Sequence, residues 1–436
     1  MALHCVNAQK VATRGSHSVW SKQSNVYEVN LRQYSASGSI KDFQKHLPRL
    51  KKMGVEILWF MPITPIGIEG RKMTSDELGS YYAVRNYQAF NPEHGTLADF
   101  KAFVKKAQGM GFKVITDWVA NHSALDNHWV KAHPNFYVKD STGKLISPFD
   151  WTDVYKLNYK DRELRDSMIQ SMRFWIKEAN IDGFRCDVAE EVPADFWKEC
   201  IDSLKKNKDV FMLAEGNKAW LHEVGFDQTY AWDMMGTMTD LYAKKINLKQ
   251  FDSALNVSIA SFPKNAYRLY FTTNHDENSW NGTEFEKYGD AYKTFAVFTQ
   301  TIYQSVPLIY NGQEEPNKKR LRFFVKDTIK WGKYANEKFY KALLTLRRSN
   351  PALAADASYR RLSTSNNDAI FSYVREKGGR KVLVILNLSD KEQKFTINDK
   401  IIAGNPYNIF LYANEKVDTK HQFNIEPWGH IVYDYK

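Results

Sequence analysis

Long apolar runs are absent from this chain of 436 residues, although 43% of its residues are hydrophobic. No stretch reaches the roughly eighteen consecutive apolar residues that a membrane-spanning helix needs, so the sequence predicts no transmembrane segment. Charged residues make up 25% of the chain, and this balance is typical of a globular protein that buries a large core. The length predicts two to three domains, or one large barrel with an appendage.

Cysteine is also scarce. The three cysteines, Cys5, Cys186 and Cys200, match no metal-binding or redox spacing. We therefore expect no essential disulfide. Cys186 stands between Arg185 and Asp187 on a predicted strand, so it points to the opposite face, where a small apolar side chain packs well.

A basic tract is missing despite a formal net charge of +11, from 61 Lys and Arg against 50 Asp and Glu. The basic residues come as scattered pairs, such as Lys51-Lys52 and Lys244-Lys245, without a nucleic-acid-binding motif. This pattern is typical of solvated helix faces. The sequence therefore predicts no nucleic-acid partner.

Residues 1–23 are interpreted as an N-terminal tail. Leu3 would end the apolar core of a secretory signal, and residues 6–8 (VNA) fit a small-residue cleavage site before Gln9. The charged start and most of the apolar core of such a signal are missing. Two interpretations stay open: a signal-peptide remnant, which favours a periplasmic or secreted protein, and a disordered tail, which leaves a cytoplasmic location.

Short runs rich in β-branched and aromatic residues alternate with longer segments of helical period, a pattern typical of βα units around a parallel sheet. Such units over residues 24–122 and 166–350 predict a closed (β/α)8 TIM barrel. The eight predicted strands run near Val26 to Tyr34, Glu56 to Pro62, Lys113 to Asn121, Gly183 to Ala189, Val210 to Gly216, Phe226 to Trp232, Tyr267 to His275 and Val306 to Asn311.

Two segments depart from this alternation. Residues 123–165, after the third predicted strand, have little periodicity and predict a small inserted subdomain that walls one side of the barrel mouth. From about Asn350 the chain shows alternating runs, which predict an antiparallel β-sandwich domain over residues 351–436. These runs are AIFSYVRE, KVLVILNLS, QKFTIN, NIFLYAN and HIVYDYK.

Three acidic residues stand at the ends of predicted strands: Asp187 in GFRCDVAEE, Glu215 in FMLAEGNK and Asp276 in FTTNHDENSW. The carboxyl ends of barrel strands converge on one mouth, so we expect the three side chains to lie together. Glycosidic cleavage with retention needs an ionised nucleophile and a protonated acid about 5 to 5.5 Å apart, and Asp187 and Glu215 on adjacent strands suit that spacing. The charge of Asp276 would favour a proton on Glu215.

Arg185 stands two residues before Asp187, so a strand places both side chains on one face. A guanidinium there would lower the pKa of Asp187 and keep this carboxylate ionised and nucleophilic. Alone, such a pair is more typical of a structural ion pair than of an active site. The acids at the two other strand ends favour the catalytic interpretation.

Other polar and aromatic side chains suit a sugar. His122, His275 and Arg185 offer hydrogen bonds to hydroxyl groups, and Tyr82 offers a flat face to the apolar side of a pyranose ring. Three tryptophans are each more typical of the protein core than of a sugar platform. They are Trp129, Trp151 and Trp280.

Short motifs occur in a fixed order along the chain, and through them it resembles the α-amylase family, glycoside hydrolase family 13, over nearly its whole length. The motifs are YYAVRNYQAFNPEHGT (81–96), DWVANH (117–122), Leu157-Asn158, GFRCDVAE (183–190), LAEG (213–216), TTNHDE (272–277) and VPLIYNGQEE (306–315). The resemblance implies retaining hydrolysis of α-1,4-glucosidic bonds in starch-derived glucans or malto-oligosaccharides. It also implies a double-displacement mechanism.

The resemblance also implies residue roles. Asp187 would be the nucleophile, Glu215 the general acid/base and Asp276 the stabiliser of the transition state, while Arg185 orients Asp187 and Asp117 fixes Arg185. His122 and His275 would bind the glucose unit being cleaved, with Tyr82 as its stacking platform. For Asp117 and Asn121 a purely structural role fits equally well.

The chain departs from the family pattern after the nucleophile motif, where Glu190-Glu191 replaces a common Lys-His pair, so we expect a different leaving-group side. In the family that histidine also serves a structural calcium site, together with the asparagine that matches Asn121. The chemistry needs no cofactor, but a structural Ca²⁺ with unassigned ligands stays open. Candidate ligands in the inserted segment, which lacks EF-hand spacing, are Asp126, Asp140, Asp150 and Asp153.

Alternatives within the family are a transglycosylase, an α-1,6-glucosidase, and a sucrose- or trehalose-directed enzyme, since these share the acids and differ in their loops. An alternative of another class is a non-catalytic glucan-binding barrel. The complete set of acids argues against it. Endo or exo action and the oligomeric state stay open.

Overall fold

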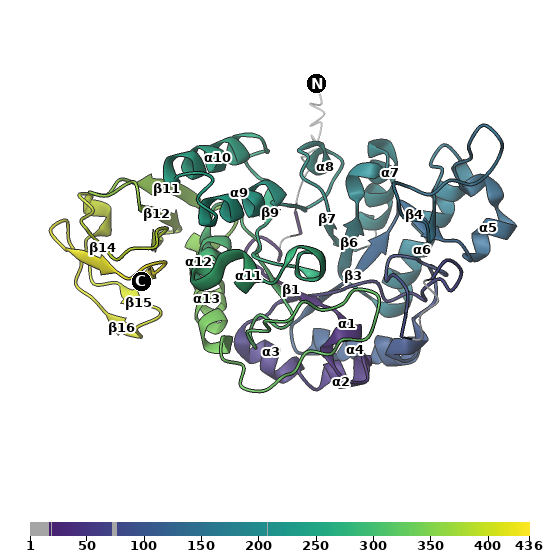
Figure 1. The fold of residues 1–436 in the computed structure, drawn as a ribbon, viewed down its shortest axis with the longest axis horizontal. Coiled ribbons are helices and arrows are strands. Elements are labelled where there is room, and N and C mark those ends of the chain that lie inside the picture. The colour runs from purple at the N-terminus through teal and green to yellow at the C-terminus, as the bar shows by residue number, and fades with distance from the viewer. Residues whose placement is uncertain (1–16, 19, 72–75, 207) are drawn as a thin grey trace, which may run out of the picture.

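The computed structural model describes residues 17–18, 20–71, 76–206 and 208–436 (Figure 1). The signal-peptide interpretation and Cys5 fall outside these ranges. Described residues of the predicted tail contact the barrel domain. Ser18 Oγ donates to Asp209 Oδ1 at 2.7 Å, and Gln23 Nε2 donates to the carbonyl of Arg347 at 2.6 Å.

Eight parallel strands form the central barrel, and their order around the sheet follows the chain, with the last strand paired to the first. The seam between the two end strands of the sheet, β9 and β10, is closed by hydrogen bonds of 3.0 Å from Val306 N to Arg268 O and from Leu308 N to Tyr270 O. The predicted (β/α)8 barrel is confirmed. Its strands are β1 (Val26–Val29), β2 (Ile57–Phe60), β3 (Lys113–Val119), β6 (Gly183–Asp187), β7 (Phe211–Ala214), β8 (Gln228–Tyr230), β9 (Tyr267–Leu269) and β10 (Leu308–Tyr310).

The first strand is shorter than predicted. It ends at Val29, and Leu31–Tyr34 form the short helix α1. The side chain of Asn30 accepts a hydrogen bond from Gln33 N, which caps this helix. Such a cap gives the backbone an alternative to the strand ladder, which the apolar pattern alone did not reveal.

Helices surround the barrel (Figure 1). Alternation along each strand sends one set of side chains into the barrel and the other into the layer between strands and helices. On β1, Val26 belongs to the inner cluster and Tyr27 to the outer one. The helices are α2 (Ile40–Gln44), α3 (Leu47–Met53), α4 (Leu97–Gly109), α6 (Arg162–Ala179), α7 (Ala194–Lys205), α8 (Trp220–Glu223), α9 (Trp232–Tyr242), α10 (Leu248–Ala260), α11 (Glu284–Tyr288), α12 (Tyr292–Thr301) and α13 (Glu337–Ser349).

Between β3 and α6 the chain leaves the barrel. It forms an antiparallel pair of strands, β4 (His122–Ala124) and β5 (Val154–Lys156), and a short helix, α5 (His128–Ala132). Figure 1 shows this segment at the end of the molecule opposite the C-terminal domain. Because β4 begins at His122, the segment carries that side chain to the barrel mouth.

The C-terminal domain is an antiparallel β domain, as predicted. A six-stranded sheet has the order β11-β12-β13-β18-β15-β16, and β14 pairs with β17. Apolar side chains of this pair, such as Phe395 and Phe423, pack on one face of the sheet. The strands are β11 (Ser358–Leu362), β12 (Ile370–Lys377), β13 (Arg380–Asn387), β14 (Gln393–Phe395), β15 (Tyr407–Asn408), β16 (Ala413–Asn414), β17 (Phe423–Ile425) and β18 (His430–Tyr435).

One predicted run of this domain differs. NIFLYAN is not a continuous strand, because a turn separates β15 from β16 and leaves Leu411 and Tyr412 exposed. Tyr412 has a left-handed backbone with φ of 57°, which a strand does not allow.

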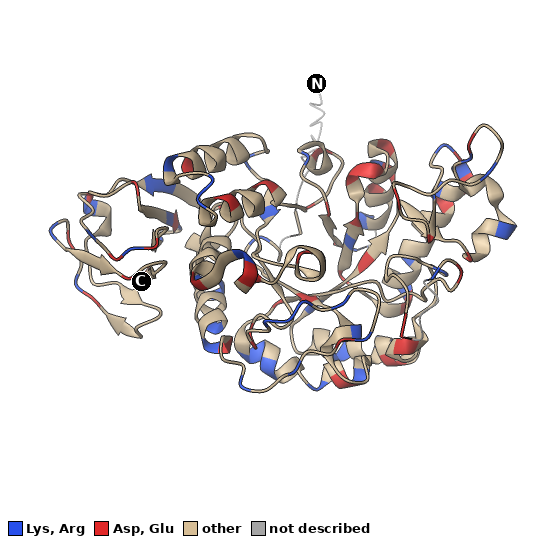
Figure 2. Cartoon of the chain, in the orientation of Figure 1, with Lys and Arg blue, Asp and Glu red and all other residues tan. Residues whose placement is uncertain are grey.

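Charge is spread over the whole molecule. Figure 2 shows Lys and Arg interspersed with Asp and Glu over the barrel, the inserted segment and the C-terminal domain. Within the described part of the chain, no helix combines the length and the apolar character needed to cross a bilayer.

Candidate active site

A cavity of about 610 Å³ opens where the carboxyl ends of the barrel strands meet the inserted segment. Arg185 and His275 lie just behind its wall, in contact with lining residues. The structure thus brings together all seven side chains that the sequence predicted for the site. Five of them line the cavity: Tyr82, His122, Asp187, Glu215 and Asp276.

Arg185 is fully buried and is shared among three carboxylates. Its Nη1 lies 2.9 Å from both Asp187 Oδ1 and Asp117 Oδ1, and its Nη2 lies 3.0 Å from Glu215 Oε1. Its Nε donates to the hydroxyl of Tyr230 at 3.2 Å. Alternation along β6 explains the arrangement, because it turns Arg185 and Asp187 to one face. Asp187 and Glu215 are therefore held on the two terminal nitrogens of one guanidinium.

The prediction that Arg185 keeps Asp187 ionised is wrong for the unliganded protein. Burial raises the pKa of Asp187 well above its ordinary value and the charge of Glu215 raises it further, so Arg185 only partly offsets both effects. Burial likewise raises the pKa of Asp276, and it raises that of Asp117 to about 6. The carboxyl cluster therefore retains a proton at a pH where an isolated aspartic acid is ionised.

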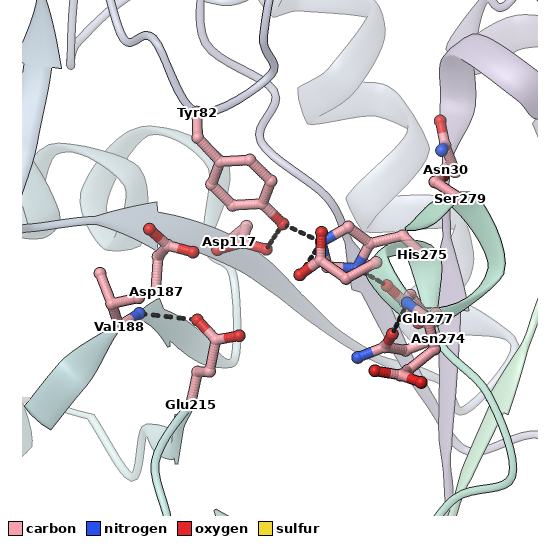
Figure 3. A network of polar contacts seen from close by, with 12 residues as sticks. Asn30, Tyr82, Asp117, Asp187, Val188, Glu215, Asn274, His275, Glu277 and Ser279 are labelled. Atoms are coloured by element: carbon pink, nitrogen blue, oxygen red, sulfur yellow. Dashed lines mark hydrogen bonds and ion pairs between the residues drawn. The ribbon is translucent and has the colours of Figure 1, made fainter. Parts of the chain in front are cut away.

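Glu215 follows β7 and is held by the backbone of the neighbouring loop. Val188 N donates to Glu215 Oε2 at 2.7 Å, and Ala189 N donates to the carbonyl of Glu215 at 3.0 Å. Figure 3 shows Glu215 beside Asp187, with Val188 reaching it from the same strand end. Val188 has a left-handed backbone with φ of 34°, which is uncommon for a β-branched residue and typical of strained functional loops.

His275 connects the sugar-facing side chains to the barrel interior. Its Nε2 lies 2.6 Å from the hydroxyl of Tyr82 and 3.3 Å from Asp276 Oδ2, and its Nδ1 lies 2.5 Å from Glu28 Oε1. The Tyr82 hydroxyl also donates to Asp117 Oδ2 at 3.2 Å (Figure 3). Burial alone would lower the pKa of His275, but Asp276 and Glu28 outweigh it and raise this pKa to about 9.

His122 differs from His275 in charge. Burial lowers its pKa to about 3, so its imidazole is neutral near pH 7. Asn121 Nδ2 lies 3.2 Å from His122 Nδ1, and an amide nitrogen can only donate, so this contact leaves the proton of the imidazole on Nε2. His122 lines the cavity, and a hydrogen bond to the backbone of Tyr82 partly offsets the effect of burial on its pKa.

Aromatic side chains line the cavity in a row. The ring of Phe323 stacks on Tyr82 with centroids 6.3 Å apart, and Trp280 lies 5.3 Å from Phe323. Trp280 is 53% exposed, so its face is free for a ligand. On the inserted segment, the ring of Trp151 lies 5.2 Å from that of His122.

The three tryptophans therefore differ from one another. Trp129 is buried against Tyr87, as a core residue should be. Trp151 and Trp280 line the cavity, so the core prediction is wrong for these two. Their neighbours come from segments far away in the chain, which the local pattern cannot show.

Glu190 and Glu191, which replace the Lys-His pair common in the family, both contact neighbouring segments. Glu190 Oε1 accepts a hydrogen bond from Asn217 N, so it ties the loop after β6 to the loop that carries Glu215. Glu191 lies 4.0 Å from Lys156 of the inserted segment. Glu190 thus fixes the loop that carries Glu215, whereas Glu191 links the loop after β6 to the inserted segment.

Two of the four candidate calcium ligands are engaged by other side chains. Within the described ranges, no three His, Cys, Asp or Glu side chains gather as a metal cage. Asp140 accepts from Thr142 in its own turn, and Asp126 pairs with Arg85.

The barrel mouth holds a buried cluster of carboxyl groups that share one arginine. This fold and this site together are typical of (β/α)8-barrel enzymes that use acid/base catalysis. Residues 21–358 match the family model described as alpha amylase, catalytic domain. Residues 370–432 match the model described as alpha-amylase SusG C-terminal domain. The chain belongs to the alpha-amylase family of glycoside hydrolases and is a glycosidase of that family.

Relatives support this assignment. Alpha-amylase 2 of Dictyoglomus thermophilum is 26% identical over 90% of this chain and 75% of its own length. A cyclomaltodextrinase of a Bacillus species is 24% identical over 80% of this chain, which spans less than two thirds, 65%, of that protein. The solved structure of maltogenic alpha-amylase AmyB from Thermotoga neapolitana is 29% identical, with a TM-score of 0.85 over 95% of this chain and 99% of that one.

Sequence reasoning missed several residues of the site. Tyr230 and Phe323 contact its members, but their own segments carry no signal for this. One feature of the sequence could have identified Glu28: a charged residue inside the apolar run VYEV of a buried strand is unusual.

Proposed function

We propose that this protein is a retaining α-glycoside hydrolase that cleaves α-1,4-glucosidic bonds in starch-derived glucans or malto-oligosaccharides. The observation that carries the proposal is the placement of Asp187 and Glu215 on the two terminal nitrogens of Arg185. Retaining cleavage needs one carboxylate and one carboxylic acid close together, and this arrangement supplies two adjacent carboxyl groups.

Arg185 couples the protonation of the two groups. A proton on Glu215 weakens its ion pair with Arg185 and leaves the guanidinium to Asp187, whose carboxylate then becomes the nucleophile. A proton on Asp187 would have the opposite effect. The reactive state is therefore the one with the proton on Glu215 and the charge on Asp187.

The reaction then proceeds as a double displacement. Asp187 Oδ attacks the anomeric carbon, the glycosidic bond breaks, and Glu215 gives its proton to the departing oxygen. Glu215, now ionised, takes a proton from water, whose oxygen attacks the same carbon and releases Asp187. Two inversions return the original α configuration, and Glu215 ends protonated as it began.

The substrate class follows from the cavity walls. Tyr82, Phe323 and Trp280 offer a row of aromatic faces, and the apolar faces of successive glucose units stack on such faces. His122, His275 and Asp276 supply donors and acceptors for the hydroxyl groups of the unit at the acids. This combination suits a linear, uncharged glucan.

A product time course on maltoheptaose, followed by proton NMR, tests the proposal. We expect α-configured malto-oligosaccharides as the first products, with Asp187→Asn inactive and Asp140→Asn, a surface control in the inserted segment, fully active. First products of β configuration would refute retention. Preferred cleavage of pullulan, isomaltose, sucrose or trehalose would contradict the proposed α-1,4 specificity and favour one of the family alternatives. Products longer than the substrate would favour a transglycosylase.

A further inference from the structure

Glu28 is a fully buried carboxylate that the mechanism above does not use. It lies on β1, where its register partners are Trp59 on β2 and Tyr310 on β10. Because Val26 belongs to the inner cluster, alternation places Glu28 inside the barrel as well, beneath the cavity. An acidic residue in this place costs stability unless a cation or several hydrogen bonds compensate its charge.

The side-chain carboxylate of Glu28 has one hydrogen-bonding partner among the described residues, and that partner is His275. Glu28 Oε1 lies 2.5 Å from His275 Nδ1, whereas Oε2 has no hydrogen-bond partner among the described residues. Burial raises the pKa of Glu28, while His275 and Arg185 lower it. With Glu28 ionised, the imidazole carries a proton on Nδ1, because a carboxylate can only accept. The opposite nitrogen, Nε2, faces the Tyr82 hydroxyl and Asp276.

The charges around the imidazole favour its cationic form. Two carboxyl groups face the region from other strands, Asp117 on β3 and Glu215 after β7, and Asp276 lies beside His275 in the same segment. Among the described residues around His275, the permanent cation is Arg185 on β6, which already serves three carboxylates. The remaining polar neighbours, the hydroxyls of Tyr82, Tyr230 and Tyr310, are neutral because burial raises the pKa of each well above its ordinary value.

We propose that Glu28 is a positioning residue that holds His275 as a doubly protonated imidazolium, with its Nε2–H directed at the sugar-binding space between Tyr82 and Asp276. A neutral imidazole bound to Glu28 through Nδ1–H would present a bare nitrogen there and could only accept. The imidazolium instead donates to a substrate hydroxyl and keeps a positive charge beside Asp276. The role toward substrate rests on the proposed function, whereas the state of the imidazole does not.

NMR of the unliganded enzyme tests this directly. In protein labelled with ¹⁵N-histidine and assigned with His275→Asn, both ring nitrogens of His275 should be protonated at pH 7.5 and should titrate together near pH 9. A neutral ring in the wild-type enzyme at pH 7.5 would overturn the proposal. This measurement needs neither a substrate nor a variant of Glu28.

Glu28→Gln removes the negative charge beside His275 but keeps the size of the side chain. The amide still accepts from Nδ1–H, but we expect the pKa of His275 to fall by about one unit or more, since a carboxylate at this distance shifts a pKa by about one to three units. Glu28→Asp should restore the cation in part. Glu284→Gln, a matched buried control that contacts Thr272 and Gln313, should leave the titration of His275 unchanged. An unchanged titration in a folded Glu28→Gln variant would also overturn the proposal.

Kinetics add a second measurement. The alkaline limb of kcat/KM on malto-oligosaccharides should move to lower pH in Glu28→Gln by the same amount as the NMR titration. If the chain cleaves no α-1,4-glucan, the proposed function fails, but the NMR titration still decides the state of His275. An NMR shift without movement of the alkaline limb would refute the role of the imidazolium in catalysis.

Discussion

Val188 holds Glu215 through a backbone hydrogen bond of 2.7 Å, and it does so from a left-handed conformation. The residue follows Asp187 directly. One loop therefore fixes both proposed catalytic carboxyl groups: the first through its place at the end of β6, the second through the N–H that follows. The cost is a β-branched side chain in a region of the backbone that favours glycine.

Val188→Gly should retain the protein's stability although it removes a side chain. Relief of about 1 to 3 kcal/mol of backbone strain offsets the loss of roughly 1 kcal/mol of apolar contact. The free energy of unfolding, measured with urea, should be unchanged or higher, with kcat/KM within about threefold because the N–H remains. Val188→Pro lacks that N–H and should be inactive. A loss of more than about 2 kcal/mol in the glycine variant would show that the conformation is not strained.

Glu215→Gln should lose activity in a way that depends on the leaving group. The variant cannot give a proton to a glucosyl oxygen, so cleavage of maltoheptaose should fall by about 10² to 10⁴. Formation of the covalent intermediate from maltosyl fluoride needs no such proton and should be affected much less. Rapid-quench measurement of fluoride release tests this. Equal losses on both substrates would assign Glu215 a role other than general acid.

Trp280→Ala should weaken the binding of long substrates. Loss of its exposed face removes about 1 to 2 kcal/mol of stacking, which corresponds to a five- to thirtyfold rise in KM for maltoheptaose. The kcat value should change little, because Trp280 lies at the outer end of the aromatic row. Tyr412→Ala, an exposed aromatic in the C-terminal domain, is the control. An equal rise in KM for both variants would argue against a role specific to Trp280.

His94→Gln should reduce the acid sensitivity of the fold. Burial lowers the pKa of His94 to about 4, and His94 Nδ1 lies 2.8 Å from the carbonyl oxygen of Gly38. The unfolded chain binds a proton near pH 6.5 and the folded protein does not, so stability falls as the pH decreases from 6.5 toward 4. Between pH 7.5 and 5 this histidine should account for about 2 kcal/mol of the loss.

Urea unfolding at the two pH values measures that difference. The variant should be less stable than the wild type at pH 7.5, because a buried ring is lost, but its stability should fall less on acidification. The same fall in both proteins would mean that His94 is protonated in the folded state.

Residue patterns within single segments predicted much of this protein. The period of two along β6 placed Arg185 and Asp187 on one face, and the ends of β6 and β7 placed Glu215 beside them. These predictions succeeded because barrel geometry converts the position of a residue along its strand into a position at the mouth. The prediction failed over Leu31–Tyr34, where one capping side chain, Asn30, decides between strand and helix.

The electrostatics of the site depended on distances between segments. Arg185, two residues before Asp187, predicted a low pKa for that carboxyl group, but burial and the charge of Glu215 raise this pKa despite the guanidinium. Glu28 and His275 are 247 residues apart in the chain, so their contact has no local signal. Trp280 faces the cavity because Phe323, from another loop, supports its ring.

The sequence by itself therefore determined the fold class, the family and the identity of the carboxyl groups, since these follow from local periodicity and short motifs. Only the tertiary structure decided which carboxyl groups share Arg185, which histidine pairs with a buried glutamate and which aromatic side chains line the cavity. The physical reason is that charge and exposure depend on every neighbour in space, whereas a strand or a motif depends on its neighbours in the chain.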